Sequence, residues 1–134
     1  LAQLSRARQD WSAVLLWLHL VLVVENEWAD GHYQRAQALA RLGRSAEARS
    51  SFEHALDLAP DHFWAHHDLG LLLIEEQQFL AARPHLQRAQ ALLAEPKLLE
   101  TIDPMIRDAV KSAVAKLLAQ CEEALQAAPP GSSR

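Results

Sequence analysis

The chain has 134 residues and a mass of 15.0 kDa, the size of a single domain with one continuous core. Hydrophobic residues make up 50% of it, with only four glycines and six prolines, and the abundance of Ala and Leu favours helix over strand. The net charge of −4 provides no basic surface, so we expect neither nucleic acid nor an anionic membrane as a partner.

The first predicted helix covers residues 11–25 and includes the most apolar run of the chain, residues 14–24. This run is much shorter than the about 20 residues that a membrane span needs, so we predict a buried helix and no membrane span. The run is not followed by the small-residue cleavage site of a signal peptide. Residues 1–8 are interpreted as the remnant of a helix that would pair with this one.

Both faces of this first helix are apolar. Its inward face is expected to hold residues spaced three or four apart, namely Val14, Leu18, Val21 and Val24. Its opposite face, which would normally meet solvent, is predicted to mediate self-association through Leu16, Trp17, Leu20 and Val23. A helix that is apolar all round requires cover, and exposed patches of this kind mark interfaces. The leading expectation is a homodimer, with cover by the C-terminal helix or by a missing domain as the alternatives.

Two predicted helix pairs follow, at 29–42 with 45–58 and at 63–76 with 79–93. A shift of 34 residues places segment 29–62 on segment 63–96, with His32 on His66. Small residues coincide where paired helices would approach closely, and large residues coincide where one pair would pack on the next: Ala36 with Gly70, Ala48 with Ala82, Ala55 with Ala89, and Phe52 with Leu86.

The ends of these helices carry local signals. Gly43 follows the helix at 29–42, where a residue tolerant of positive φ can close it. Pro60 ends the helix at 45–58, and Asp61 is expected to cap the next one. Pro84 is an irregularity, because an interior proline costs about 3 kcal/mol in a helix. We therefore expect the helix at 79–93 to kink or to start late.

These positions resemble the tetratricopeptide repeat family, whose pattern combines small residues, one bulky residue and a late proline at fixed places. Segment 29–62 matches that pattern with Ala36, Ala48, Phe52, Ala55 and Pro60, whereas segment 63–96 has Ala94 in place of proline and Gln77 in place of glycine. The resemblance implies an all-α fold, an α-solenoid of antiparallel helix pairs with about two and a half units over residues 1–96, residues 1–28 being the half repeat. Segment 61–70 is also similar to repeats beside bacterial glycosyltransferases, sulfotransferases and methyltransferases.

The period is lost after residue 96. Residues 97–103 are predicted to be a connector with one helical turn, and Asp103-Pro104 is typical of a helix start. The segment 104–128 is predicted to be an amphipathic helix that caps the stack, with an apolar stripe formed by Ile106, Val110, Ala113, Val114, Leu117, Cys121 and Leu125. Residues 129–134 are expected to be a flexible tail. As the chain's single cysteine, Cys121 excludes an intramolecular disulfide and fits a reducing compartment, which favours a cytoplasmic location.

Repeats of this family present a concave groove formed by the first helix of each pair. The resemblance therefore implies a partner-binding groove lined by Asp30, Tyr33, Gln37, Arg41, Trp64, His67, Leu71 and Glu75. Relatives that grip a terminal carboxylate use Lys and Asn at places that here hold Tyr33, Gln37, His67 and Leu71, so we do not expect a chaperone-tail adaptor. The alternative is that these side chains cover a purely structural surface.

The histidines and carboxylates give little support to chemistry. His62 and His66 lie four residues apart, but no third ligand follows at the spacing of a zinc motif, so we predict structural histidines, no metal and no cofactor. The sequence has no glycine-rich phosphate loop and no nucleophile elbow. It predicts a non-catalytic scaffold that binds a protein or peptide and associates with itself. The alternative is a regulatory or substrate-docking domain of a larger transferase.

Overall fold

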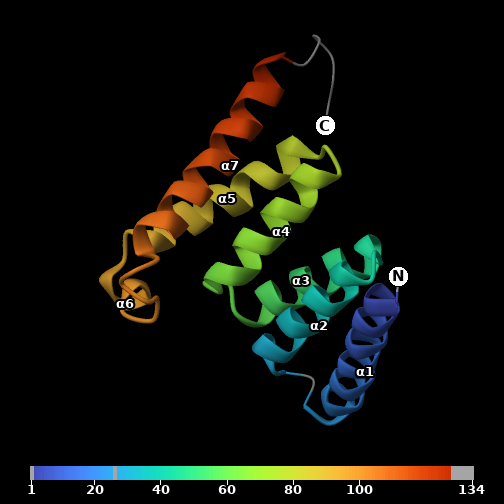
Figure 1. Ribbon diagram of the computed structural model, residues 1–134. Coiled ribbons are helices and arrows are strands. Elements are labelled where there is room, and N and C mark those ends of the chain that lie inside the picture. The colour runs from blue at the N-terminus through green and yellow to red at the C-terminus, as the bar shows by residue number, and fades with distance from the viewer. Residues whose placement is uncertain (1, 26, 128–134) are drawn as a thin grey trace. The chain divides into compact units, whose positions relative to one another are not determined.

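The computed structural model describes residues 2–25 and 27–127, with side chains described from Asp10 onward. Every regular element in these residues is a helix, as the composition predicted (Figure 1). The helices are α1 (Ala2–Val24), α2 (Ala29–Arg41), α3 (Ser45–Leu58), α4 (Phe63–Glu75), α5 (Phe79–Leu93), α6 (Pro96–Leu99) and α7 (Arg107–Ala127). The chain divides into two compact units, residues 1–65 and 66–134, which are described in turn. The predicted tail, 129–134, lies outside the described residues.

The first unit is built on the helix pair α2 and α3, with α1 packed against α2. The small positions of the repeat are fully buried there, as Ala36, Ala48 and Ala55 are each 0% exposed. Phe52, the large residue of the repeat, is 2% exposed and therefore buried as well. The predicted register of small and large residues is therefore confirmed for segment 29–62, since one misplaced residue would turn a helix face by about 100°.

The N-terminal helix differs from the prediction at its start. Residues 2–8 continue α1, which begins at Ala2, so they are not the remnant of a separate partner helix. The stretch 2–10 has no proline or glycine, and its alanines and long polar residues have good helix propensity. Among the described residues, no helix is long and apolar enough to cross a membrane.

The inward face of α1 was predicted only in part. Leu18 is buried, but Val14 and Val24 are 40% and 79% exposed, and Leu22 is buried instead. The packed stripe runs through residues 15, 18 and 22, which rotates the contact face by roughly 90° from the predicted one at 3.6 residues per turn. The helix α5, the second of its pair, packs against both α4 and α7, whereas α1 packs against α2. The register of a full repeat therefore does not transfer to this half repeat.

The first helix of each pair ends with the same backbone motif, once in each unit. In the first unit, Gly43 N–H donates to the carbonyl of Ala40 (3.1 Å) and Arg44 N–H to that of Leu39 (2.9 Å). In the second unit, Gln77 N–H donates to Ile74 (2.9 Å) and Gln78 N–H to Leu73 (2.7 Å). This is the Schellman arrangement, which requires a left-handed residue after the helix. Gly43 has φ +78°, as predicted, and Gln77 adopts φ +60° although it is not glycine.

The second unit places α4 against α5 at their smallest side chain. A Cβ atom added to Gly70 would lie 2.7 Å from Cγ and from Cδ2 of Leu86, so the two helices meet at van der Waals distance there. Leu86, Ala82 and Ala89 are 0% exposed, which confirms the predicted register in segment 63–96. The helix α5 begins at Phe79 and contains Pro84 in its interior, so the expectation of a late start is wrong.

The C-terminal helix covers α5, against which it packs. Val114 and Cys121 from the predicted stripe are 0% exposed, and Arg83 of α5 lies 3.7 Å from Glu122 of α7. The helix starts at Arg107 rather than at Pro104, because Asp103 and Pro104 form a turn in which the Asp103 carboxylate accepts the N–H of Met105 at 2.9 Å. The predicted helical turn in the connector is α6, which has Pro96 at its first position.

Candidate partner-binding site

A pocket of about 490 Å³ opens on the first unit, against the exposed side of α2. Residues from three segments line it: Trp11 and Val14 from α1; Asp30, Tyr33, Gln34 and Gln37 from α2; and His62 and Trp64 from the start of α4. The volume lies within the range of about 300–1,000 Å³ typical of small-ligand sites, which is enough for one or two side chains of a bound peptide.

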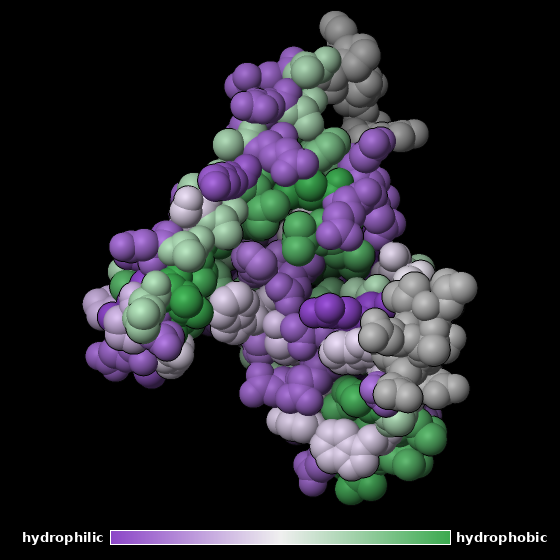
Figure 2. Space-filling view, viewed as in Figure 1, coloured by the Kyte–Doolittle hydropathy of each residue, from purple (hydrophilic) through white to green (hydrophobic). Residues whose placement is uncertain are grey.

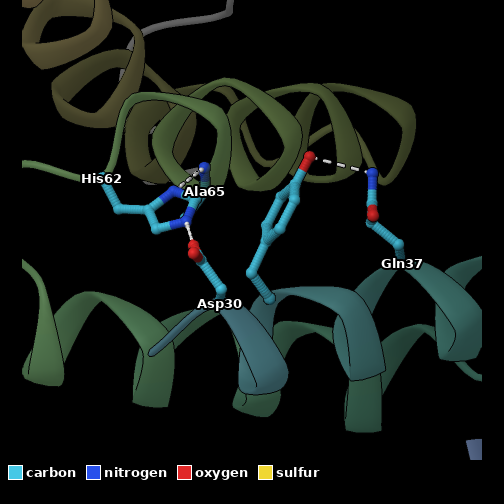
Figure 3. A network of polar contacts seen from close by, with 5 residues as sticks. Asp30, Gln37, His62 and Ala65 are labelled. Carbon is cyan, nitrogen blue, oxygen red and sulfur yellow. Dashed lines mark hydrogen bonds and ion pairs between the residues drawn. The ribbon is translucent and has the colours of Figure 1, made fainter. Parts of the chain in front are cut away.

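His62 is held at the pocket by contacts at both of its ring nitrogens (Figure 3). The N–H of Ala65 donates to Nδ1 at 3.1 Å, so this nitrogen carries no proton, and the ring caps the first turn of α4. The other nitrogen, Nε2, then carries the proton and donates to Oδ1 of Asp30 at 2.7 Å. The imidazole is therefore uncharged in this arrangement. The capping group is this ring, whereas the sequence suggested the Asp61 carboxylate.

Tyr33 fixes the centre of the pocket. Its ring lies 4.9 Å from the His62 ring and 6.0 Å from the ring of buried Phe52, so it is wedged between the pocket and the core. Its hydroxyl oxygen accepts a hydrogen bond from Nε2 of Gln37 at 2.8 Å, one helical turn further along α2 (Figure 3). These contacts restrict the Tyr33 side chain, which gives the pocket a preformed floor.

Two indole rings form the sides of the pocket. The Trp64 ring packs edge-on against Phe63, with 4.8 Å between ring centroids. The guanidinium carbon of Arg41 lies 5.4 Å from the centre of the Trp11 ring, within the range of a cation–π contact. Arg41 is thereby placed beside the pocket through Trp11.

The structure brings together part of the groove predicted from the sequence. Asp30, Tyr33, Gln37 and Trp64 line the same pocket, with Arg41 beside it. The other predicted groove residues belong to the second unit: Nδ1 of His67 lies 2.8 Å from Oδ1 of Asp68, Leu71 is half-buried, and Glu75 is exposed. Their part in one groove remains a prediction.

The sequence did not identify Trp11, Val14, Gln34 or His62 as pocket residues, since no spacing rule links α1 to the start of α4.

The remaining histidines mainly pack against one another. His32 and His66, which share one repeat position, are each 8% exposed. The His32 ring lies 4.1 Å from that of His54, and the His66 ring lies 5.4 Å from that of His85. Both contacts join the two helices of a pair, as the shared position suggested. Among the residues that the structure describes, no three His, Cys, Asp or Glu side chains are grouped to hold a metal.

The predicted self-association residues are exposed on α1. Leu16, Trp17, Leu20 and Val23 are 61%, 56%, 60% and 70% exposed, and Figure 2 shows hydrophobic side chains at the surface over this helix. Cys121, by contrast, is buried against α5, and burial together with the nearby Glu122 carboxylate raises the pKa of its thiol. A thiol of raised pKa in a packed helix face is a poor nucleophile, in keeping with its predicted place in the core.

The fold is found in several solved structures. They include the TPR2B domain of yeast Sti1 in complex with pHsp70, which is 20% identical with a TM-score of 0.70 over 87% of this chain and 86% of that one. The type III secretion translocator chaperone SycD of Yersinia enterocolitica is 13% identical, with a TM-score of 0.75 over 94% of this chain and 86% of that one. The TPR domain of Sgt2 from Aspergillus fumigatus is 16% identical, with a TM-score of 0.69 over 97% and 81%.

Comparison of the sequence alone gives a narrower result. No curated protein matches the chain at a significant level. The model of the tetratricopeptide repeat family matches residues 29–62, the segment in which the buried small residues and Phe52 occupy the family's positions. Residues 29–62 are therefore a tetratricopeptide repeat, in a chain that has the all-helical fold of tetratricopeptide-repeat domains.

Proposed function

We propose that the chain is a non-catalytic interaction domain that binds a peptide segment of a partner protein in the pocket between α1, α2 and the start of α4. The observation that carries this proposal is the pocket itself, in which three aromatic residues surround a fixed Asp30–His62 pair. Aromatic residues with few rotatable bonds lose little entropy when a ligand orders against them, so such surfaces favour binding. The Sti1 domain, which has this fold, was solved in complex with pHsp70, and this supports a peptide or protein ligand here.

The experiment is a selection of random peptides on the purified chain, followed by binding to two matched variants. We expect Trp64→Ala to weaken the selected peptides by about tenfold or more, because it removes one side of the pocket. Leu80→Ala is the control, since it removes a large apolar side chain, 46% exposed, that lies outside both the pocket lining and the proposed self-association face. Equal binding to both variants, with retained helical content, would disprove the location of the site.

A second interaction surface is supported by the exposed apolar face of α1. We propose that Leu16, Trp17, Leu20 and Val23 pair with the same residues of a second copy. A two-fold interface uses the patch twice, and burying each side chain contributes roughly 1.5–3 kcal/mol before the cost of association. SycD, which has this fold, was also solved as a structure described as an alternative dimer. We also propose a cytoplasmic location, supported by the single, buried cysteine.

A role as the docking domain of a larger transferase is the alternative function. A catalytic domain in the same polypeptide would favour it, and in that case the pocket would bind the acceptor protein.

A further inference from the structure

We infer that the pocket selects an arginine side chain of its peptide ligand, whose guanidinium stacks on the aromatic walls and pairs with the carboxylate of Asp30. This inference rests on the proposed peptide-binding function and adds the chemical class of the ligand. It follows from three features of the pocket, namely its aromatic faces, its negative charge and the tautomer of His62.

The aromatic faces are the first feature. Trp11, Tyr33 and Trp64 line one pocket, and each ring presents a negative π face that attracts a cation within about 6 Å of its centre. Within this chain, the Trp11 ring already receives a guanidinium, that of Arg41, at 5.4 Å. This contact shows that the Trp11 ring can receive a cation of the kind proposed for the ligand.

The charge of the pocket is the second feature. Asp30 is the one acidic residue in the described lining, which contains no Lys or Arg side chain. Its side chain is 65% exposed although Oδ1 contacts His62, and an ionised carboxylate offers about four acceptor positions. Asp30 is therefore able to accept hydrogen bonds from a guanidinium and from His62 together.

The state of His62 is the third feature. Because Nδ1 accepts the N–H of Ala65, the ring that contacts Asp30 is uncharged and leaves the negative charge of the carboxylate in place. A charged imidazole would have neutralised that carboxylate and removed the preference for a cation. The packing of the first turn of α4 thus leaves the Asp30 carboxylate available to a cationic ligand.

Arginine fits this combination better than lysine or an acidic group. A guanidinium is planar, stacks on aromatic rings and donates two parallel hydrogen bonds to one carboxylate, whereas an ammonium is a compact, strongly hydrated charge. An acidic peptide terminus would meet the Asp30 carboxylate in the lining, whereas the Arg41 guanidinium lies beside the pocket on the Trp11 ring and is not part of the lining.

The test is an NMR titration of the indole N–H signals, which belong to Trp11, Trp17, Trp28 and Trp64. The probe is the blocked peptide acetyl-Gly-Ser-Arg-Ser-Gly-amide, compared with the same peptide carrying citrulline, lysine or glutamate in place of arginine. We expect the arginine peptide to shift the signals of Trp11 and Trp64, which line the pocket, and to leave that of Trp17 unchanged. Citrulline has nearly the same shape without the charge, so we expect it to bind at least about tenfold more weakly.

Two variants with the same change of charge complete the test. Asp30→Asn should weaken the arginine peptide by about tenfold, whereas Asp57→Asn, an exposed position on α3 outside the pocket lining, should leave its affinity unchanged. Equal weakening by both would indicate a long-range effect of net charge and would overturn the inference.

The failures of the two proposals differ in this experiment. If citrulline or glutamate peptides shift Trp11 and Trp64 as strongly as the arginine peptide, the arginine inference is wrong and the peptide-binding function stands. If peptides selected from the random library also leave these two signals unmoved, both proposals are wrong.

Discussion

Gly70 and Leu86 are packed so closely that a Cβ atom on the glycine would lie 2.7 Å from Cγ and Cδ2 of the leucine. The equivalent residues of the preceding repeat are Ala36 and Phe52, both buried. The two repeats therefore use the same pair of positions but fill them with side chains of different volume. In the second repeat the α4 position holds glycine, and Leu86 of α5 packs directly against it.

This contact predicts the effect of Gly70→Ala. Alanine is favoured over glycine in a helix interior by about 1 kcal/mol, but overpacking a tight contact costs about 1–3 kcal/mol. We expect a net loss of about 1 kcal/mol in the free energy of unfolding. In a Leu86→Ala background, which removes the clashing atoms, the same change should become stabilising. Urea denaturation of the four proteins measures this coupling, and a stabilising Gly70→Ala in the unmodified chain would contradict it.

A change to glycine at Gln77 should stabilise the chain, in contrast to the loss of stability expected for Gly70→Ala. Gln77 adopts φ +60° at the place where Gly43 has φ +78°, and an L-residue in this region costs about 1 kcal/mol or more. We expect Gln77→Gly to raise the free energy of unfolding by about 0.5–1 kcal/mol. Gly43→Ala should lower it by about 1 kcal/mol through the backbone alone, because a Cβ there would have no neighbour within 4 Å. The neighbouring Glu76→Gly, at a residue without positive φ, is the control and should destabilise.

Phe52 is the largest fully buried side chain among those described in the first unit. Phe52→Ala should cost about 3–5 kcal/mol, since it removes the ring and leaves a cavity. Ala36→Leu should cost about 1–3 kcal/mol by overpacking the buried α2 position that carries a small residue in both repeats. Thermal melts followed by circular dichroism test both changes, and an unchanged melting temperature in either would show that the repeat register is wrong.

The raised pKa of the Cys121 thiol predicts slow alkylation. Its main cause is burial, followed by the Glu122 carboxylate, while Arg83 acts in the opposite direction. We expect iodoacetamide to label the folded chain far more slowly than the chain in urea at neutral pH, because the thiolate is the reactive form. The folded state holds the thiol proton more tightly than the unfolded chain does. The contribution of Cys121 to the free energy of unfolding is therefore complete below the thiol pKa of the unfolded chain, about 8.5, and is lost as the pH rises through the thiol pKa of the folded chain. Fast labelling of the folded chain would contradict this.

The α1 surface predicts a change of oligomeric state. The double variant Trp17→Glu with Leu20→Lys should be a monomer with unchanged helical content, because both side chains are more than half exposed. Light scattering at about 100 µM, where a dimer of micromolar affinity would be formed, measures the mass of both proteins. A monomeric unmodified chain would refute self-association, and an unfolded double variant would show that these side chains belong to the core.

Much of the fold could be predicted from the sequence because its signals are periodic or local. The 34-residue shift placed the buried alanines, Phe52 and Leu86 correctly, since close-packed helix pairs restrict each position to either small or large side chains. Gly43 marked a left-handed residue for a steric reason that acts within a few bonds. The predicted start of α7 was wrong because a local signal can be ambiguous. The Asp103 carboxylate can accept a backbone N–H either at the start of a helix or in a turn, and here it does so in a turn.

What only the tertiary structure decided is how the faces of the helices meet. The sequence showed that α1 is apolar on all sides, but packing against α2 chose the stripe through Leu18 and Leu22 and left Leu16 and Trp17 outside. Likewise, the residues of the pocket were visible one by one, yet Trp11, Asp30 and His62 come from three segments. Periodicity fixes which residues share a helix face, because it depends on backbone geometry alone. Which face is covered, and which distant side chains meet, depends on the packing of whole helices against one another.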